Sequence, residues 1–291
     1  MSIIILSVLF VSIVLSLGRN MLSKNISDFA FGTYEFFYMQ TLIFGCGCAV
    51  LICSAIIDGK GISGLTLVYA LIYAVLLLAA QWCYTAALKN GNTSVCVTVY
   101  SLGFIIPTMS GCLLWGESFG VRSLLGLICV ILSIIISGST KNTDTQKNGK
   151  HIIPLVFAML ASGGLGVMQK IQQKSAFATE KSEFILAAFL IAASISFICF
   201  MISKKNAVGN TVNKAKIFSA AGAGACFGCC NLANTFLAGK LNSSFFFPVQ
   251  NISVILLSLI LSIPIFHERI GKKELAVLCL GGCAILLLNN G

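Results

Sequence analysis

Ten long apolar segments separated by short polar breaks make up most of the chain. Each is close to the roughly 20 residues with which an α-helix crosses a bilayer, and none shows the alternating pattern of about ten residues typical of membrane β-barrel strands. The pattern predicts an all-α membrane protein with ten transmembrane helices. The expected helices cover residues 2–22, 31–57, 65–88, 93–115, 120–138, 152–174, 184–203, 215–238, 244–266 and 272–289.

One arrangement of segments occurs twice: an apolar segment with a proline, a short polar elbow, and a further apolar segment. Glu117 and Gly120 of the first elbow correspond to Glu268 and Gly271 of the second. Only the second elbow has a histidine, so a shared chemical role for the two elbows is disfavoured, and we expect both to anchor helix ends. We predict a first five-helix repeat at residues 1–139, a polar linker at 140–150 and a second five-helix repeat at 151–291. Because five is odd, the second repeat enters the membrane from the opposite side. Such inverted repeats are typical of transporters that work by alternating access.

Composition agrees with a multi-pass protein of the cell membrane, for which we expect the bacterial cytoplasmic membrane. The chain is 57% hydrophobic and only 10% charged, too few charges to cover a water-soluble surface. Its net charge of +10 comes from Lys and Arg in the short breaks, without the aromatic residues that accompany them in nucleic-acid surfaces, so we expect no nucleic-acid partner. More of these cations follow odd-numbered segments, a count that by the positive-inside rule favours both termini outside and leaves cytoplasmic termini open as the alternative.

Cysteine usage indicates no metal or cofactor. Nearly all of the thirteen cysteines lie inside apolar segments, where cysteine behaves as a small hydrophobic residue. The closely spaced Cys226, Cys229 and Cys230 have no nearby histidine or acidic residue to complete a metal site.

Several short motifs at segment ends carry a family resemblance. They are Gly18-x-Asn20-x-x-x-Lys24, Tyr84-x-x-Ala87-Leu88-Lys89, Pro107 through Trp115-Gly116-Glu117, Gln169-Lys170, Asn234-x-x-x-Ala238-Gly239-Lys240, Phe247-Pro248, and Phe266-His267-Glu268-Arg269 with Gly271. On these motifs the chain resembles the EamA group of the drug/metabolite transporter superfamily. The resemblance implies a secondary transporter whose central cavity is lined by the first, third, fourth, sixth, eighth and ninth helices. Members often have an arginine in the second helix, where this chain has Glu35 and then Gln40, so the role of that arginine does not carry over.

Polar residues inside the third and eighth segments are candidates for substrate binding. Spacings of three and four place Gln81 and Tyr84 on one helix face, with Trp82 beside them. Asn231 and Asn234 share a face of the eighth segment in the same way. Each face either lines a cavity or makes hydrogen bonds between helices, and the sequence favours neither.

The fourth and ninth segments add further candidates at matching depths. Tyr100 corresponds to Asn251, which follows Gln250, and this matched pair is the leading candidate for substrate contact. Pro107 and Pro248 lie inside their segments, where proline removes a helix hydrogen bond and permits a kink, so we expect them to act as hinges.

Two glutamates, Glu35 and Glu183, open the second and seventh segments at equivalent places. A carboxylate isolated from water is a candidate for carrying a coupling proton. The alternative is a structural carboxylate, paired with Arg19 or Lys170 or stabilising a helix N-terminus.

These features predict a secondary active transporter that exports a small, amino-acid-like or mildly polar metabolite. A transporter of cationic drugs is the alternative, since Trp82, Tyr84 and Tyr100 offer an aromatic surface to a cation. An enzyme acting on lipids is disfavoured, because the only two histidines lie at segment ends. The glycine spacing at Gly224 and Gly228, and again around Gly163 and Gly166, predicts close packing of helices within one chain. We therefore expect a monomer or a weak dimer. The expected partners are the lipid bilayer, a small-molecule substrate and a coupling proton.

Overall fold

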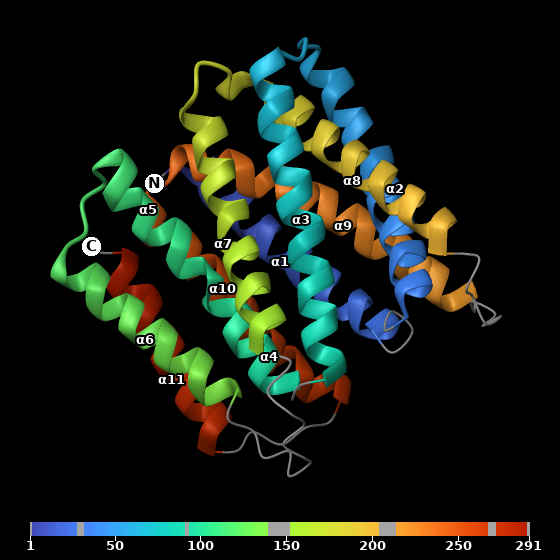
Figure 1. Cartoon of the computed structure of the whole chain (residues 1–291). Helices are drawn as coiled ribbons and strands as arrows, with labels where there is room; N and C mark the ends of the chain where they lie inside the picture. Colours follow the sequence, from blue (N-terminus) through green and yellow to red (C-terminus); the bar gives the residue numbers. More distant parts are fainter. Residues whose placement is uncertain are drawn as a thin grey trace. The chain divides into compact units, whose positions relative to one another are not determined.

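The computed structural model describes residues 2–27, 32–90, 93–138, 152–203, 214–266 and 272–289, and within these ranges the chain forms helices and no strand (Figure 1). The helices follow the ten predicted segments closely, and one segment is interrupted. They are α1 (Ile3–Ser27), α2 (Thr33–Asp58), α3 (Gly64–Asn90), α4 (Thr93–Ser101), the 3-10 turn η1 (Leu102–Phe104), α5 (Ile105–Trp115), α6 (Val121–Gly138), α7 (Ile152–Lys174), the 3-10 turn η3 (Ala178–Glu180), α8 (Lys181–Ser203), α9 (Lys214–Lys240), α10 (Ser243–Phe266) and α11 (Lys272–Asn289).

Most of these helices suit a bilayer. In the described residues, α1, α2, α3, α7 and α8 are each long and apolar enough to cross it, and shorter apolar helices occur in α5, α6, α10 and α11. Large apolar side chains such as Ile56 and Leu113, which are 74% and 80% exposed, would be unfavourable in water and are covered by lipid in a membrane. α9 is less apolar, because it contains four glycines and two asparagines. The chain is an all-α integral membrane protein.

The predicted fourth helix is interrupted at η1, between α4 and α5. Pro107 has no N–H to donate to the carbonyl of Gly103, four residues earlier, and its ring crowds that carbonyl. Gly103 also allows a close approach to α7, since a Cβ at this position would lie 2.7 Å from the carbonyl oxygen of Met159. The break is therefore where a proline and a tight helix contact coincide. Pro248, by contrast, lies within the continuous helix α10.

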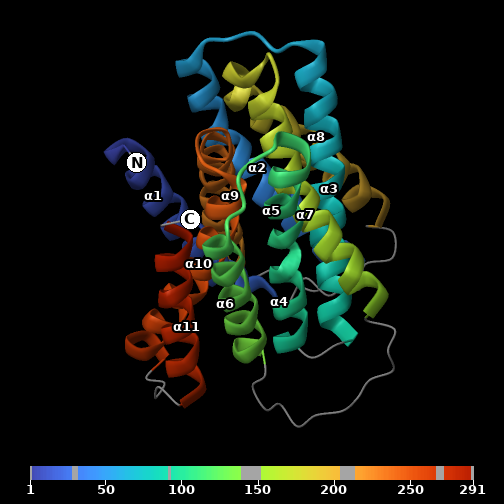
Figure 2. The same cartoon turned by 90° about the vertical axis from the view of Figure 1, so that its left-hand side faces the viewer.

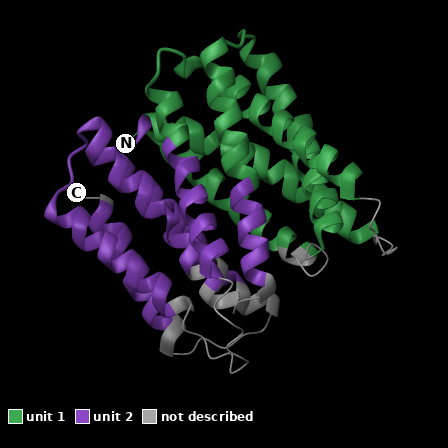
Figure 3. Ribbon diagram, viewed as in Figure 1, with its two compact units in different colours: residues 1–78, 168–239 green, residues 79–167, 240–291 purple. Residues whose placement is uncertain are grey.

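The chain divides into two compact units, and each draws on both predicted repeats (Figure 3). Unit 1 contains Met1–Leu78 and Met168–Gly239, and unit 2 contains Ala79–Val167 and Lys240–Gly291. In unit 1, α2 packs along α8 (Figure 1). In unit 2, α6 packs along α11 and α5 packs against α10 (Figure 2). Each of these pairs joins helices that occupy equivalent places in the two predicted repeats.

Glycines bring the helices of unit 1 into backbone contact. A Cβ on Gly224 of α9 would overlap the carbonyl oxygen of Ile43 in α2. A Cβ on Gly228, one turn later, would lie 3.0 Å from the carbonyl oxygen of Gly47. In unit 2, a Cβ on Gly163 would meet both the carbonyl oxygen of Gly103 and a side chain of α5. These glycines therefore allow close helix packing within each unit, while the prediction of a monomer or weak dimer stays a prediction.

Candidate functional site

Unit 1 contains a buried hydrogen-bonded cluster formed by Tyr73 of α3, Gln169 of α7 and Asn231 of α9. The Tyr73 hydroxyl donates to Oδ1 of Asn231 at 2.6 Å, and Nε2 of Gln169 donates to the Tyr73 hydroxyl at 2.9 Å. Tyr73 is fully buried, and the other two side chains are no more than 6% exposed. The cluster connects three helices, so Asn231 makes the interhelical hydrogen bonds that were the alternative for its helix face.

A second polar group lies between α1 and α9 of unit 1. The thiol of Cys230 contacts the Ser16 hydroxyl, with Sγ and Oγ 2.9 Å apart, and Nδ2 of Asn234 lies 3.4 Å from the same sulfur. Oδ1 of Asn234 is buried and accepts no hydrogen bond from the described residues. An unsatisfied buried amide oxygen costs about 1–3 kcal/mol, which makes it a site where a bound solute with a donor group would be favoured.

Arg19 belongs to the same region. It lies inside α1, eight residues before the helix ends, rather than in a connecting break. Its guanidinium carbon lies 3.6 Å from the centre of the Phe227 ring. Phe227 in turn packs on the rings of Phe44 and Phe189, with centroids 6.1 and 5.3 Å away. Because a cationic side chain inside a membrane helix is costly, an arginine held there is a candidate for a functional role.

α1 and α9 contact each other along their lengths and run in opposite directions. Ser16 meets Cys230, Arg19 meets Phe227, and Leu22 lies where a side chain on Gly222 would reach. Higher numbers on one helix meet lower numbers on the other, so α1 and α9 pack antiparallel. This register brings the polar residues of both helices onto one shared face.

The aromatic candidates lie in unit 2. The Tyr84 and Tyr100 rings are tilted against each other with centroids 4.5 Å apart. Trp82, on α3, is 39% exposed, while Gln81 is half-buried. The structure therefore pairs two of the three predicted aromatic residues.

The remaining candidates of unit 2 lie on α10. Gln250 is buried, and Asn251 donates its amide N–H to the carbonyl of Phe247 in its own helix at 2.9 Å. Substrate contact by Gln250 and Asn251 stays a prediction.

The two glutamates differ in their surroundings. Glu35 is half-buried in the first turn of α2, and its carboxylate folds back over Gly32, the residue that precedes the helix. Glu183 occupies the same place in α8 but is only 7% exposed, and neither of its buried carboxylate oxygens has a hydrogen-bond partner in the part of the chain that the structure describes. Glu183 is thus the more isolated carboxylate.

Other acidic residues serve helix ends. Oε2 of Glu117 accepts a hydrogen bond from the backbone N–H of Ser243 at 2.6 Å, where α10 begins. The carboxylate of Glu180 accepts from the backbone N–H and the hydroxyl of Ser63, directly before α3, both at 2.9 Å. A carboxylate at a helix N-terminus is favourable. The first elbow therefore anchors a helix end as predicted, while the second elbow lies in residues 267–271, outside the described ranges.

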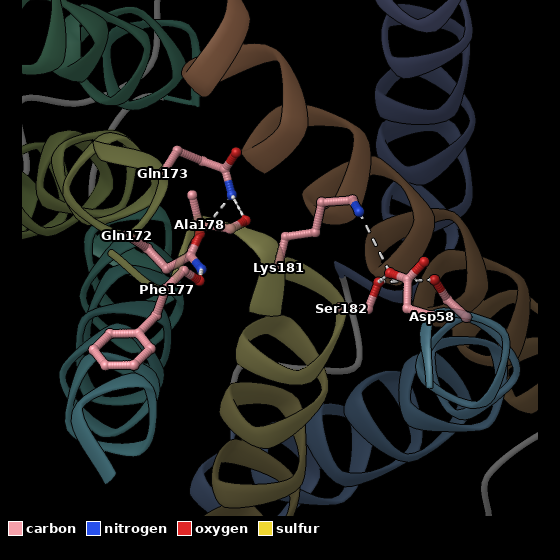
Figure 4. Close-up of polar contacts among 8 residues, drawn as sticks. Asp58, Gln172, Gln173, Phe177, Ala178, Lys181 and Ser182 are labelled. Carbon is pink, nitrogen blue, oxygen red and sulfur yellow. Dashed lines mark hydrogen bonds and ion pairs between the residues drawn. The ribbon is translucent and has the colours of Figure 1, made fainter. Parts of the chain in front are cut away.

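Figure 4 shows a polar group where α2 ends and α8 begins. The Ser182 hydroxyl donates to the carboxylate of Asp58, and Nζ of Lys181 lies 3.4 Å from the same carboxylate. Gln172 and Gln173 donate to backbone carbonyls of the connection after α7. Lys181 and Asp58 are each about 30% exposed, and an exposed ion pair of this kind contributes little to stability. We assign this group a structural role, in which its hydrogen bonds hold the connection between α7 and α8.

Sequence reasoning did not select Tyr73, and it treated Arg19 as a flanking cation. Tyr73 lies within LIYAVLL, an apolar run that gives no sign of a hydrogen-bond partner. For Arg19 a signal was present, since it precedes the predicted end of the first segment.

Apolar helices with polar side chains buried among them define a polytopic helical membrane protein. Residues 1–139, a little under half of the chain, match the EamA-like transporter family, which is part of the drug/metabolite transporter superfamily. A solved structure, described only as a crystal structure of a protein, resembles it with a TM-score of 0.79 over 96% of this chain and 94% of that one. Its sequence identity is 14%, so the likeness concerns the fold alone. No curated protein matches the chain by sequence.

Proposed function

We propose that the protein is a secondary active transporter that exports a small, amino-acid-like or mildly polar metabolite across the cell membrane of a bacterium. The family match supports transport in general. The substrate class rests on one observation, the polar groups that α1, α3, α7 and α9 bury within unit 1. These are four of the helices that the family resemblance implies as cavity lining.

For the mechanism, we propose alternating access between two inverted repeats, residues 1–139 and 151–291. The packing of equivalent helices, α2 with α8 and α6 with α11, supports this proposal, because a two-fold relation between repeats brings such helices together. The break at Pro107 supplies a place where the fourth helix can bend.

We further propose that Glu183 carries the coupling proton. The observation that supports this role is that both of its oxygens are buried and, among the described residues, accept no hydrogen bond. Glu35 is half-buried at a helix start and suits the structural role.

Uptake into proteoliposomes tests the proposal. The purified protein would be reconstituted and assayed with radiolabelled amino acids, with and without an imposed pH gradient. We expect uptake above that of empty liposomes for at least one amino acid, and accumulation above the external concentration only with the gradient. Uptake that never exceeds equilibration, whatever the gradient, would indicate a passive channel instead.

The contact between Tyr84 and Tyr100 favours a second candidate function, transport of organic cations. The same liposomes assayed with a fluorescent cationic dye separate the two. Dye transport without amino-acid transport would favour this second function.

A further inference from the structure

Arg19 lies four residues before Ser23, where the apolar part of α1 ends, and its side chain contacts α9. Its guanidinium covers the ring of Phe227, which is the central residue of the 27-residue helix α9, Lys214–Lys240. Thirteen residues of helix on either side correspond to about 20 Å. A cation that merely reached for the headgroups would lie near a helix end, so the position of this guanidinium calls for another explanation.

The guanidinium is also available to a ligand. In the described part of the chain, its partner is the Phe227 ring, and neither a carboxylate nor a hydrogen-bond acceptor engages its N–H groups. Stacking uses the flat face of the guanidinium and leaves its five in-plane N–H donors free. Phe44 and Phe189 pack against Phe227 and hold that ring in place, so the arginine rests on a rigid support.

We infer that Arg19, stacked on Phe227, is the subsite that binds the carboxylate of the transported solute. This inference rests on the proposed function and narrows its substrate class to solutes with a carboxylate. A planar guanidinium matches a carboxylate with two parallel hydrogen bonds, an arrangement that a lysine does not reproduce. The site is poorly suited to an organic cation, because the like charge of Arg19 repels it.

The first test needs no variant. In proteoliposomes, each amino acid that the wild-type protein transports would be compared with its primary amide, which has the same side chain and amino group but no carboxylate. We expect the amide to show a KM about 10- to 100-fold higher, as the loss of charge-assisted hydrogen bonds requires. Equal transport of acid and amide overturns the subsite and leaves the proposed function standing.

The second test uses Arg19→Lys and Arg19→Gln, with Arg122→Lys as the matched control, since Arg122 is an exposed arginine in the first turn of α6. We expect both Arg19 variants to raise KM for the acid, and Arg19→Gln to lose the preference for acid over amide. The control should keep wild-type values. An Arg19→Gln protein that still prefers the acid overturns the subsite. If the wild-type protein transports no amino acid, the proposed function fails and the subsite fails with it.

Discussion

Replacing Gly224 by alanine tests the close approach of α9 to α2 in unit 1. A Cβ at this position would overlap the carbonyl oxygen of Ile43, and it would also lie 3.0 Å from the Ile43 Cα. Because these are backbone atoms, only a shift of one helix away from the other relieves the clash. Gly222, two residues earlier in α9, is the matched control, since its Cβ would meet only the end of the Leu22 side chain, at 3.0 Å.

The control isolates the packing cost. Alanine is favoured over glycine in a helix interior by about 1 kcal/mol at either position, so this gain cancels between the two variants. Overpacking of a filled interior costs about 1–3 kcal/mol. We therefore expect Gly224→Ala to be less stable than Gly222→Ala by that amount. For a chain of this size, the difference lowers the thermal midpoint by roughly 2–12 °C.

Thermal unfolding of both variants in detergent, followed as loss of the monodisperse peak in size-exclusion chromatography, measures this difference. Gly224 lies one turn before Phe227, so we also expect Gly224→Ala to reduce amino-acid uptake more than Gly222→Ala does. Equal midpoints for the two variants would refute the reasoning, because they would mean that α2 and α9 are not in backbone contact at Gly224.

The other predictions concern coupling and the buried cluster. We expect Glu183→Gln to abolish substrate accumulation driven by a pH gradient, while exchange of substrate between the two sides of the membrane persists. We expect Glu35→Gln to retain pH-driven accumulation. Accumulation by Glu183→Gln at the wild-type rate would remove Glu183 from the mechanism. We expect Tyr73→Phe to lower the free energy of unfolding by about 1–3 kcal/mol, because Asn231 and Gln169 lose their shared hydroxyl partner. An unchanged thermal midpoint for Tyr73→Phe would contradict that role.

The helices were predictable because a bilayer imposes both their length and their apolar composition. The predicted segment 152–174 has the same limits as α7, and 272–289 the same as α11. The break in the fourth helix was less predictable. Pro107 indicated a possible kink, but the 3-10 turn also lies where Gly103 meets α7, which is a contact distant in sequence.

The candidate site was predictable only in part, because polarity alone does not say what a side chain contacts. Asn234 and Asn231 share a helix face, yet one has an unsatisfied amide oxygen and the other is held by Tyr73. Likewise Glu35 and Glu183 are equivalent in sequence and differ in burial. Both differences depend on neighbouring helices.

The sequence by itself determined the class of protein, the approximate limits of most of the described helices, and the small residues at helix contacts. Each of these follows from the local composition of the chain, because the lipid around a membrane helix requires an apolar segment of a certain length. Only the tertiary structure decided that Arg19 rests on the centre of α9 and that Tyr73 joins three helices. Such contacts join residues about 100 to more than 200 positions apart in the chain, and they are set by the register and rotation of packed helices, which hydrophobicity alone does not specify.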